Sequence, residues 1–108
     1  MGKDYFGSEF EEFGFTPHVN ARMSDGSYRP VMLSTTKEPY FGHVTVHLKP
    51  MEEQATIRFG SLMYFGSACL LEDMSLKGRS SEDLKAMLDY AAKCSHLLTR
   101  FGLTTTPQ

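Results

Sequence analysis

The stretch that decides the fold is YFGHVTVHLK, residues Tyr40 to Lys49. From Val44 onward, valine or leucine occupies every second position, and the polar residues beside them are His43, Thr45, His47 and Lys49. Such alternation with a period of two is typical of a strand that has one face in a core and the other outside. We therefore predict a β-strand here, with its valines and leucine buried.

A second alternating stretch follows after a short polar interval. Residues 55–59 read ATIRF, and residues 50–53, PMEE, have the composition of a loop. If residues 50–53 form a four-residue hairpin loop, apolar residues lie opposite apolar residues across the two strands, and polar residues lie opposite polar ones. The predicted pairs are Val44–Phe59, Val46–Ile57 and Leu48–Ala55 on the core side, and Thr45–Arg58 and His47–Thr56 on the outer side. A shift of one residue would set apolar groups against polar ones, so the register is strongly specified.

Composition limits the class of protein. The 108 residues suffice for one domain with a modest core, and the 41% apolar and 22% charged content is that of a soluble globular chain. The net charge of −2 gives no general attraction to nucleic acid or to anionic membranes. No apolar run approaches the roughly 20 residues that span a bilayer, and the N-terminus lacks the regions of a signal peptide. Cys69 and Cys94 form no ligand or disulfide motif, so we expect reduced thiols and a cytoplasmic location.

The remaining strands follow from shorter patterns. Residues 18–23 and 28–34 are predicted strands joined by a turn at Ser24–Ser27, with Pro30 at an edge or bulge. Residues 61–65 and 68–71 indicate one or two short buried strands, and residues 72–79 a polar loop. The predicted fold class is α+β, an antiparallel meander sheet of four to five strands with one long C-terminal helix packed on one face.

The helix is predicted to begin at Ser80 or Ser81 and to end at Phe101-Gly102, because caps and charges fit both ends. At about 100° per residue, the core stripe is Leu84, Leu88, Ala91 and Leu98. A second apolar stripe beside it consists of Met87, Tyr90, Cys94, Leu97 and Phe101. The apolar arc is about 200° wide, roughly twice what a helix on one sheet needs. Either the N-terminal segment or a second copy in a homodimer should therefore cover the second stripe.

Residues 1–16 form an acidic and aromatic segment of the single domain 1–108. Its aromatic residues could fold back onto the core, which we favour because large apolar side chains are usually buried. Alternatively, the segment is an arm that docks into a basic, apolar groove of another protein. The partner-binding residues of such an arm would be Tyr5, Phe6, Glu9, Glu11 and Glu12.

The dipeptide Phe-Gly recurs at irregular spacing. Its six phenylalanines are Phe6, Phe13, Phe41, Phe59, Phe65 and Phe101. We interpret each occurrence as an aromatic anchor followed by a turn or bulge.

Few residues suggest chemistry. His43 and His47 lie about 13 Å apart on a strand, too far to share a metal ion. We predict instead one hydrogen-bonding surface that gains positive charge below neutral pH. Its residues are His43, Thr45, His47, Lys49, Thr56 and Arg58. No phosphate loop, nucleophile motif or ligand grouping is present, so we expect no catalytic residue, no metal ion and no cofactor.

The leading hypothesis is a small non-catalytic protein-interaction module, homodimeric, that acts as an inhibitor or adaptor on a larger macromolecule. Surplus apolar surface on the helix, the acidic-aromatic segment and the lack of catalytic motifs support it. Inhibitors of host defence nucleases from phages and mobile elements, such as anti-CRISPR proteins, have this profile, so a nucleic-acid-processing complex is one partner we consider. Two alternatives remain, a protein that binds single-stranded nucleic acid through the outer sheet face and an unrecognised small enzyme.

Overall fold

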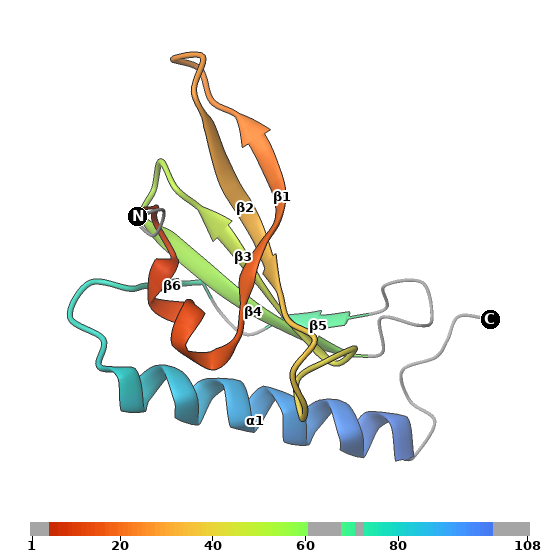
Figure 1. Ribbon diagram of the computed structural model, residues 1–108. Coiled ribbons are helices and arrows are strands. Elements are labelled where there is room, and N and C mark those ends of the chain that lie inside the picture. Colours follow the sequence, from red (N-terminus) through yellow and green to blue (C-terminus); the bar gives the residue numbers. More distant parts are fainter. Residues whose placement is uncertain (1–4, 61–67, 71–72, 101–108) are drawn as a thin grey trace.

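The computed structural model describes residues 5–60, 68–70 and 73–100, with side chains for 5–60 and 73–97. The elements are the 3-10 helix η1 (Ser8–Phe13), the strands β1 (Thr16–Arg22), β2 (Tyr28–Ser34), β3 (Val44–Lys49), β4 (Gln54–Gly60), β5 (Ala68–Leu70) and β6 (Met74–Ser75), and the helix α1 (Ser81–Arg100). The antiparallel sheet has the order β1-β2-β3-β4-β5, and β6 also pairs with β4. Helix α1 packs against β4 and β3 (Figure 1). The predicted α+β meander with one long C-terminal helix is confirmed.

The β3–β4 hairpin is the centre of the molecule. Every predicted cross-strand pair is observed, and the loop between the strands is the predicted residues 50–53. The core-side residues of both strands are at most 8% exposed. They pack in one cluster with Leu84, Leu88 and Ala91 of α1, whose 3.6-residue spacing brings them onto one helix face.

The N-terminal segment folds back onto this core. Phe10 and Phe15 are fully buried, and Phe13 is 9% exposed. The ring centroids of Phe15 and Tyr40 lie 5.5 Å apart. A Cβ atom at Gly7 would come within 2.8 Å of a Leu48 methyl group, so the backbone itself approaches the sheet closely. The folded-back arrangement, rather than a free arm, is therefore the one observed for these phenylalanines.

Two local features differ from or refine the predictions. The predicted polar loop 72–79 contains strand β6, because Met74 and Leu76 are buried and Met74 pairs with Ala55. Helix α1 begins as predicted, since the backbone N–H of Asp83 donates to Ser80 Oγ at 3.1 Å and makes Ser80 the cap. The predicted helix end at residues 101–102 and the predicted strand at 61–65 lie outside the described residues.

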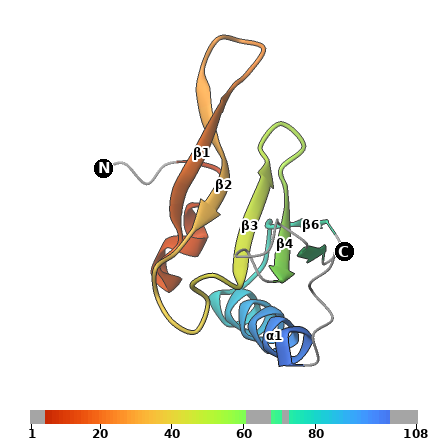
Figure 2. The ribbon, with the colours of Figure 1, turned by 90° about the vertical axis from the view of Figure 1, so that its right-hand side faces the viewer.

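The β1–β2 hairpin projects from the rest of the sheet. β1 pairs with β2 along its length, whereas β2 pairs with β3 only through Met32 and Leu33. The outer half of this hairpin therefore diverges from β3–β4, as Figures 1 and 2 show. Two bulges interrupt its ladder: His18 is an extra residue on β1, and Val31 is an extra residue on β2.

Candidate functional site

Five of the six residues predicted on the outer sheet surface do lie on that side of β3 and β4. Thr45 is opposite Arg58, and His47 is opposite Thr56. The two threonines are buried, at 2% and 7% exposure, so this face is less open to water than its polar sequence suggests. Lys49 Nζ lies 2.6 Å from Asp73 Oδ2 in an exposed ion pair.

The prediction is wrong for His43, whose side chain contacts helix α1 instead. Its Nδ1 lies 3.0 Å from Ser95 Oγ, and its ring centroid lies 4.2 Å from that of His96. Gly42, with a φ of 82°, turns the chain just before β3, so the alternation of the strand does not govern His43. Ser95 Oγ donates to the carbonyl of Gly60 at 3.1 Å, and it therefore accepts the proton of His43 Nδ1.

The contact between His43 and Ser95 joins the sheet to the helix, and it does not activate Ser95 as a nucleophile. An attacking serine must reach substrate while an adjacent base removes its proton. Ser95 is fully buried, and its proton is directed to a backbone carbonyl. The contact therefore acts in packing.

Burial lowers the pKa of both His43 and His47. It lowers the pKa of His43, with the neighbouring His96 acting in the same direction and Glu38 opposing them. Burial also lowers the pKa of His47, together with the positive charge of Arg58. The predicted gain of positive charge on this surface is thereby shifted to more acidic pH.

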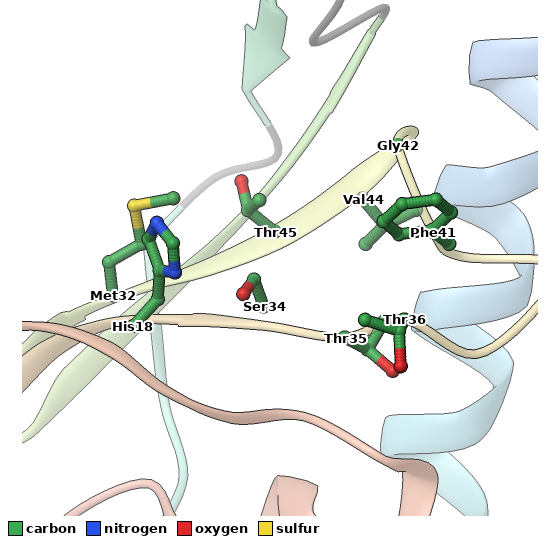
Figure 3. Close-up of a pocket in the computed structure, with 9 residues that line it drawn as sticks. All are labelled: His18, Met32, Ser34, Thr35, Thr36, Phe41, Gly42, Val44 and Thr45. Atoms are coloured by element: carbon green, nitrogen blue, oxygen red, sulfur yellow. The ribbon is translucent and has the colours of Figure 1, made fainter.

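A pocket of about 400 Å³ opens beside these residues, on the outer face of the sheet (Figure 3). Its lining residues are His18, Met32, Ser34, Thr35, Thr36, Phe41, Gly42, Val44 and Thr45. They come from β1, β2, β3 and the connection 35–43, which is why no single motif in the sequence indicates the pocket. The extra residue of the β1 bulge, His18, is one of them, and bulges often redirect a side chain at a binding site.

Among the four described Phe-Gly pairs, Phe41 is the phenylalanine with an exposed ring. In the four described pairs the glycine has positive φ, as the interpretation of a turn requires. Phe13 and Phe59 are buried, and Phe6 packs against the core, whereas Phe41 is 52% exposed at the pocket. Its backbone is nevertheless fixed, because its N–H donates to the carbonyl of Lys37 at 3.0 Å.

Tyr40, which precedes Phe41, holds the connection 35–43 against helix α1. The hydroxyl of Tyr40 donates to Asp89 Oδ1 at 2.5 Å, and Lys85 Nζ lies 2.7 Å from the other carboxylate oxygen of Asp89. Tyr40 is itself only 5% exposed. The ring of Phe41 is thus presented from an anchored backbone.

A second, more polar pocket of about 360 Å³ adjoins the first and is lined by His47, Lys49, Thr56, Arg58 and Asp73. Asp73 accepts hydrogen bonds from Lys49 and Thr56, so its charge is already compensated. Arg58 differs, because its Nε is buried without a hydrogen-bond partner and no described carboxylate pairs with it. A hydrogen-bonding contact of 3.0 Å between Thr45 Oγ1 and His47 Nε2 joins the two pockets. We call them together the outer-face site.

The second stripe of the helix is partly exposed. Tyr90 is 59% and Leu97 43% exposed, Met87 and Cys94 are partly buried, and Phe101 lies outside the described residues. The N-terminal segment meets α1 at its first turn, where Ser81 donates to Glu12. Tyr90 and Leu97 stay exposed, so the described part of the N-terminal segment does not cover the second stripe in the way that one of the two predictions expected.

The five predicted contact residues of the N-terminal arm are largely used within the chain. Tyr5 donates to Glu11, and both Tyr5 and Phe6 pack against the core. Glu9 and Glu12 are exposed, and Glu12 accepts the hydrogen bond from Ser81. These residues do not form one free binding arm.

Within the described ranges, no three side chains of His, Cys, Asp or Glu gather closely enough to hold a metal ion. In the same part of the chain, no helix is long and apolar enough to cross a membrane. No family model, curated protein or solved structure matches the sequence or the fold. The basis for a function is therefore the geometry of the projecting hairpin, the outer-face site and the helix stripe.

Proposed function

We propose that this protein is a small non-catalytic module that binds another protein and acts as an inhibitor or adaptor on a larger macromolecule. The supporting observation is the projecting β1–β2 hairpin. Residues 16–32 contribute no side chain to the hydrophobic core, and six of the seven residues of β1 are exposed. Tyr28, at 70% exposure, and Val19, at 42%, offer apolar surface to a partner.

Such a hairpin is costly to maintain without a partner. Ordering each residue costs about 1–2 kcal/mol of conformational entropy, and an isolated two-stranded hairpin is marginal in water. The core offsets little of this cost here, because the hairpin buries few apolar groups. β1 is an edge strand of the sheet that the described residues form, so one side of it leaves backbone N–H and C=O groups that a strand of another protein can pair with.

The side chains of the hairpin indicate the chemistry of the partner. Arg22 and Arg29 are exposed, whereas Asp25 accepts hydrogen bonds from the N–H and hydroxyl of Ser27. Tyr28 pairs with Arg22 across the ladder. Tyrosine and arginine are enriched where binding energy concentrates at protein interfaces, so we expect an acidic partner surface with an apolar centre.

Capture from the source cells, followed by a binary affinity measurement with the purified partner, tests the proposal. The double variant Arg22→Gln/Tyr28→Ser should weaken binding about 100-fold or more, since two interface anchors of this type contribute several kcal/mol. Met51→Ser is the matched control, because Met51 is 63% exposed at the tip of the other hairpin. Equal affinity of the double variant and the wild type would refute binding through the β1–β2 hairpin.

We also propose that two copies associate through the second stripe of α1. An antiparallel pairing would set Glu82 and Asp83, in the first turn of one helix, beside the end of the other, where the sequence has Arg100. The stripe is narrow, whereas a stable interface buries about 800 Å² per partner. We therefore expect a weak dimer that dissociates on dilution. Sedimentation should show a dimer that Leu97→Glu abolishes and Met51→Glu does not, and a wild type that is monomeric at millimolar concentration would exclude it.

Single-stranded nucleic acid is the alternative partner of the outer sheet face. Arg58 supports it, and Phe41 could stack on a base. In the described part of the site, however, Arg58 is the one fixed cation without a compensating carboxylate. Nucleic-acid affinity arises from many neutralised phosphates, so the structure supports a protein partner better.

A further inference from the structure

We propose that the outer-face site binds an extended segment of the partner protein in which a large apolar side chain is followed two residues later by an aspartate or glutamate. The apolar side chain would occupy the pocket beside Phe41, and the carboxylate would pair with Arg58. This inference rests on the proposed protein-binding function and adds a sequence preference to it.

The first pocket suits one large apolar side chain. Its volume of about 400 Å³ exceeds that of any single side chain, and Met32 and Phe41 supply apolar walls. Figure 3 shows His18 and Met32 on one side and Phe41 and Thr36 on the other, with Ser34 and Thr45 between them. Sites of this kind combine apolar walls with a few polar groups that fix the orientation of the ligand.

The half-exposed ring of Phe41 favours a macromolecular segment over a free small molecule. Small-molecule sites enclose most of the surface of their ligand, whereas this ring extends the apolar surface beyond the pocket. A chain that crosses the rim would cover the ring. The hydroxyls of Ser34 and Thr36 line the pocket and can hydrogen-bond the backbone of that chain.

The second pocket suits one carboxylate. The charge of Asp73 is compensated by Lys49, so the positive charge of Arg58 has no described counterpart. Arg58 lines this pocket, and its Nε is buried without an acceptor, so no hydrogen bond of that atom offsets the charge. Because Nε has almost no accessible surface, a ligand carboxylate would accept from the two terminal nitrogens of the guanidinium, in a bidentate pair.

The spacing of the two pockets sets the spacing in the ligand. Thr45 lines the apolar pocket, and Arg58 lies directly opposite it on β4. Residues opposite one another across a ladder have Cβ atoms about 4.5–5.5 Å apart. An extended chain advances about 3.3–3.6 Å per residue and points successive side chains to opposite sides. Residues i and i+2 of the ligand, about 7 Å apart, therefore reach the two pockets, which lie on one face of the sheet.

The experiment uses two blocked tripeptides with the full-length protein, N-acetyl-Trp-Gly-Asp-amide and N-acetyl-Trp-Gly-Asn-amide, which differ only in the charge. In two-dimensional NMR, the aspartate probe should shift the signals of His18, Phe41 and Thr45. It should bind about tenfold more tightly than the asparagine probe, as expected for a charge-assisted pair. It should also raise the pKa of the His47 ring, because a carboxylate beside Arg58 offsets the charge that lowers it.

Variants separate the two halves of the site. Arg58→Gln should remove the preference for aspartate and the rise in the His47 pKa while leaving weak binding of both probes. Ser34→Phe should fill the pocket and abolish binding of both. Lys77→Gln is the control that changes neither, because Lys77 is an exposed cation that lines neither pocket. Unchanged one-dimensional spectra of each variant outside the site would show that the fold is intact.

Three outcomes would overturn the inference. These are equal affinity for the two probes, an absence of shifts at the outer face with either probe, and stronger shifts there with a thymidine dinucleotide than with the aspartate probe. The probes report on the outer-face site alone, whereas the hairpin variants report on partner capture. Failure of the inference can therefore be distinguished from failure of the proposed function.

Discussion

The two hairpins of this protein have strands of similar length but opposite environments. In β3–β4 the pairing is regular and most residues of both strands are buried. In β1–β2 two bulges interrupt the pairing, and six of the seven residues of β1 are exposed. The difference indicates that the outer part of β1–β2 contributes little buried apolar surface to folding, compared with β3–β4 and its helix.

The largest expected effect is that of Ile57→Ala compared with Val19→Ala. Ile57 is fully buried under α1 in β4, so its truncation should destabilise the protein by about 2–5 kcal/mol. Val19 is 42% exposed in β1, and its truncation should change the free energy of unfolding by about 0.5 kcal/mol or less. Urea unfolding followed by circular dichroism measures both.

A cost for Val19→Ala close to that for Ile57→Ala would break the comparison. It would mean that the β1–β2 hairpin packs cooperatively with the core. The proposal that the hairpin is a surface available for binding would then lose its support.

The same contrast explains how much of the fold the sequence could predict. Where one face is buried, alternation determines the register, and all five pairs predicted for β3–β4 are observed. The caps of α1 similarly indicated a start at Ser80 or Ser81, and Ser80 caps the observed helix Ser81–Arg100. The bulges of β1–β2 could not be predicted, because an exposed ladder places no comparable constraint on which side chains face inward.

The candidate site was predicted less well than the fold. His43 was placed on the outer face by extending the alternation of β3 back by one residue from Val44. His43 directly follows Gly42, whose left-handed backbone turns the chain before the strand begins. Ser95 lies in the middle of the core stripe of α1, but a polar residue there carries no signal unless its partners, Gly60 and His43, are known. The pocket beside Phe41 combines three strands and a connection, so only the tertiary structure brings its residues together.

Ser95→Ala should have the second largest effect. The substitution leaves the carbonyl of Gly60 and the Nδ1 of His43 without their buried partner, which costs about 1–3 kcal/mol. Ser27→Ala removes the hydroxyl that contacts Asp25 in the exposed turn of the projecting hairpin, and it should cost well under that. Urea midpoints of the two variants compare a buried hydroxyl with an exposed one. Similar costs for both would argue that Ser95 is not the joint between sheet and helix.

A smaller effect should appear as a pH dependence confined to the β3–β4 side. The pKa values of His43 and His47 are lowered below 6.5 in the folded protein, chiefly by burial. The unfolded state therefore binds more protons as the pH falls below 6.5, and stability should decrease on acidification from pH 7.5 to 5.5. His43→Asn and His47→Gln, measured as urea midpoints at several pH values, should each reduce this slope. A slope unchanged in both variants would contradict the assignment.

The smallest effect on stability should be that of Tyr28→Ala. Tyr28 is 70% exposed in β2, outside the core, so its removal should change the free energy of unfolding by about 0.5 kcal/mol or less. The same variant should weaken binding of the partner protein substantially, because exposed tyrosines are frequent anchors of interfaces. Urea unfolding and a binary affinity measurement on one preparation provide the two numbers. A loss of stability as large as that of Ser95→Ala would show that the ring supports the hairpin itself, and any loss of affinity would then follow from its unfolding. Retained stability with lost affinity would place Tyr28 at the interface. It would also support the division of the molecule into one hairpin that stabilises the fold and one that binds the partner.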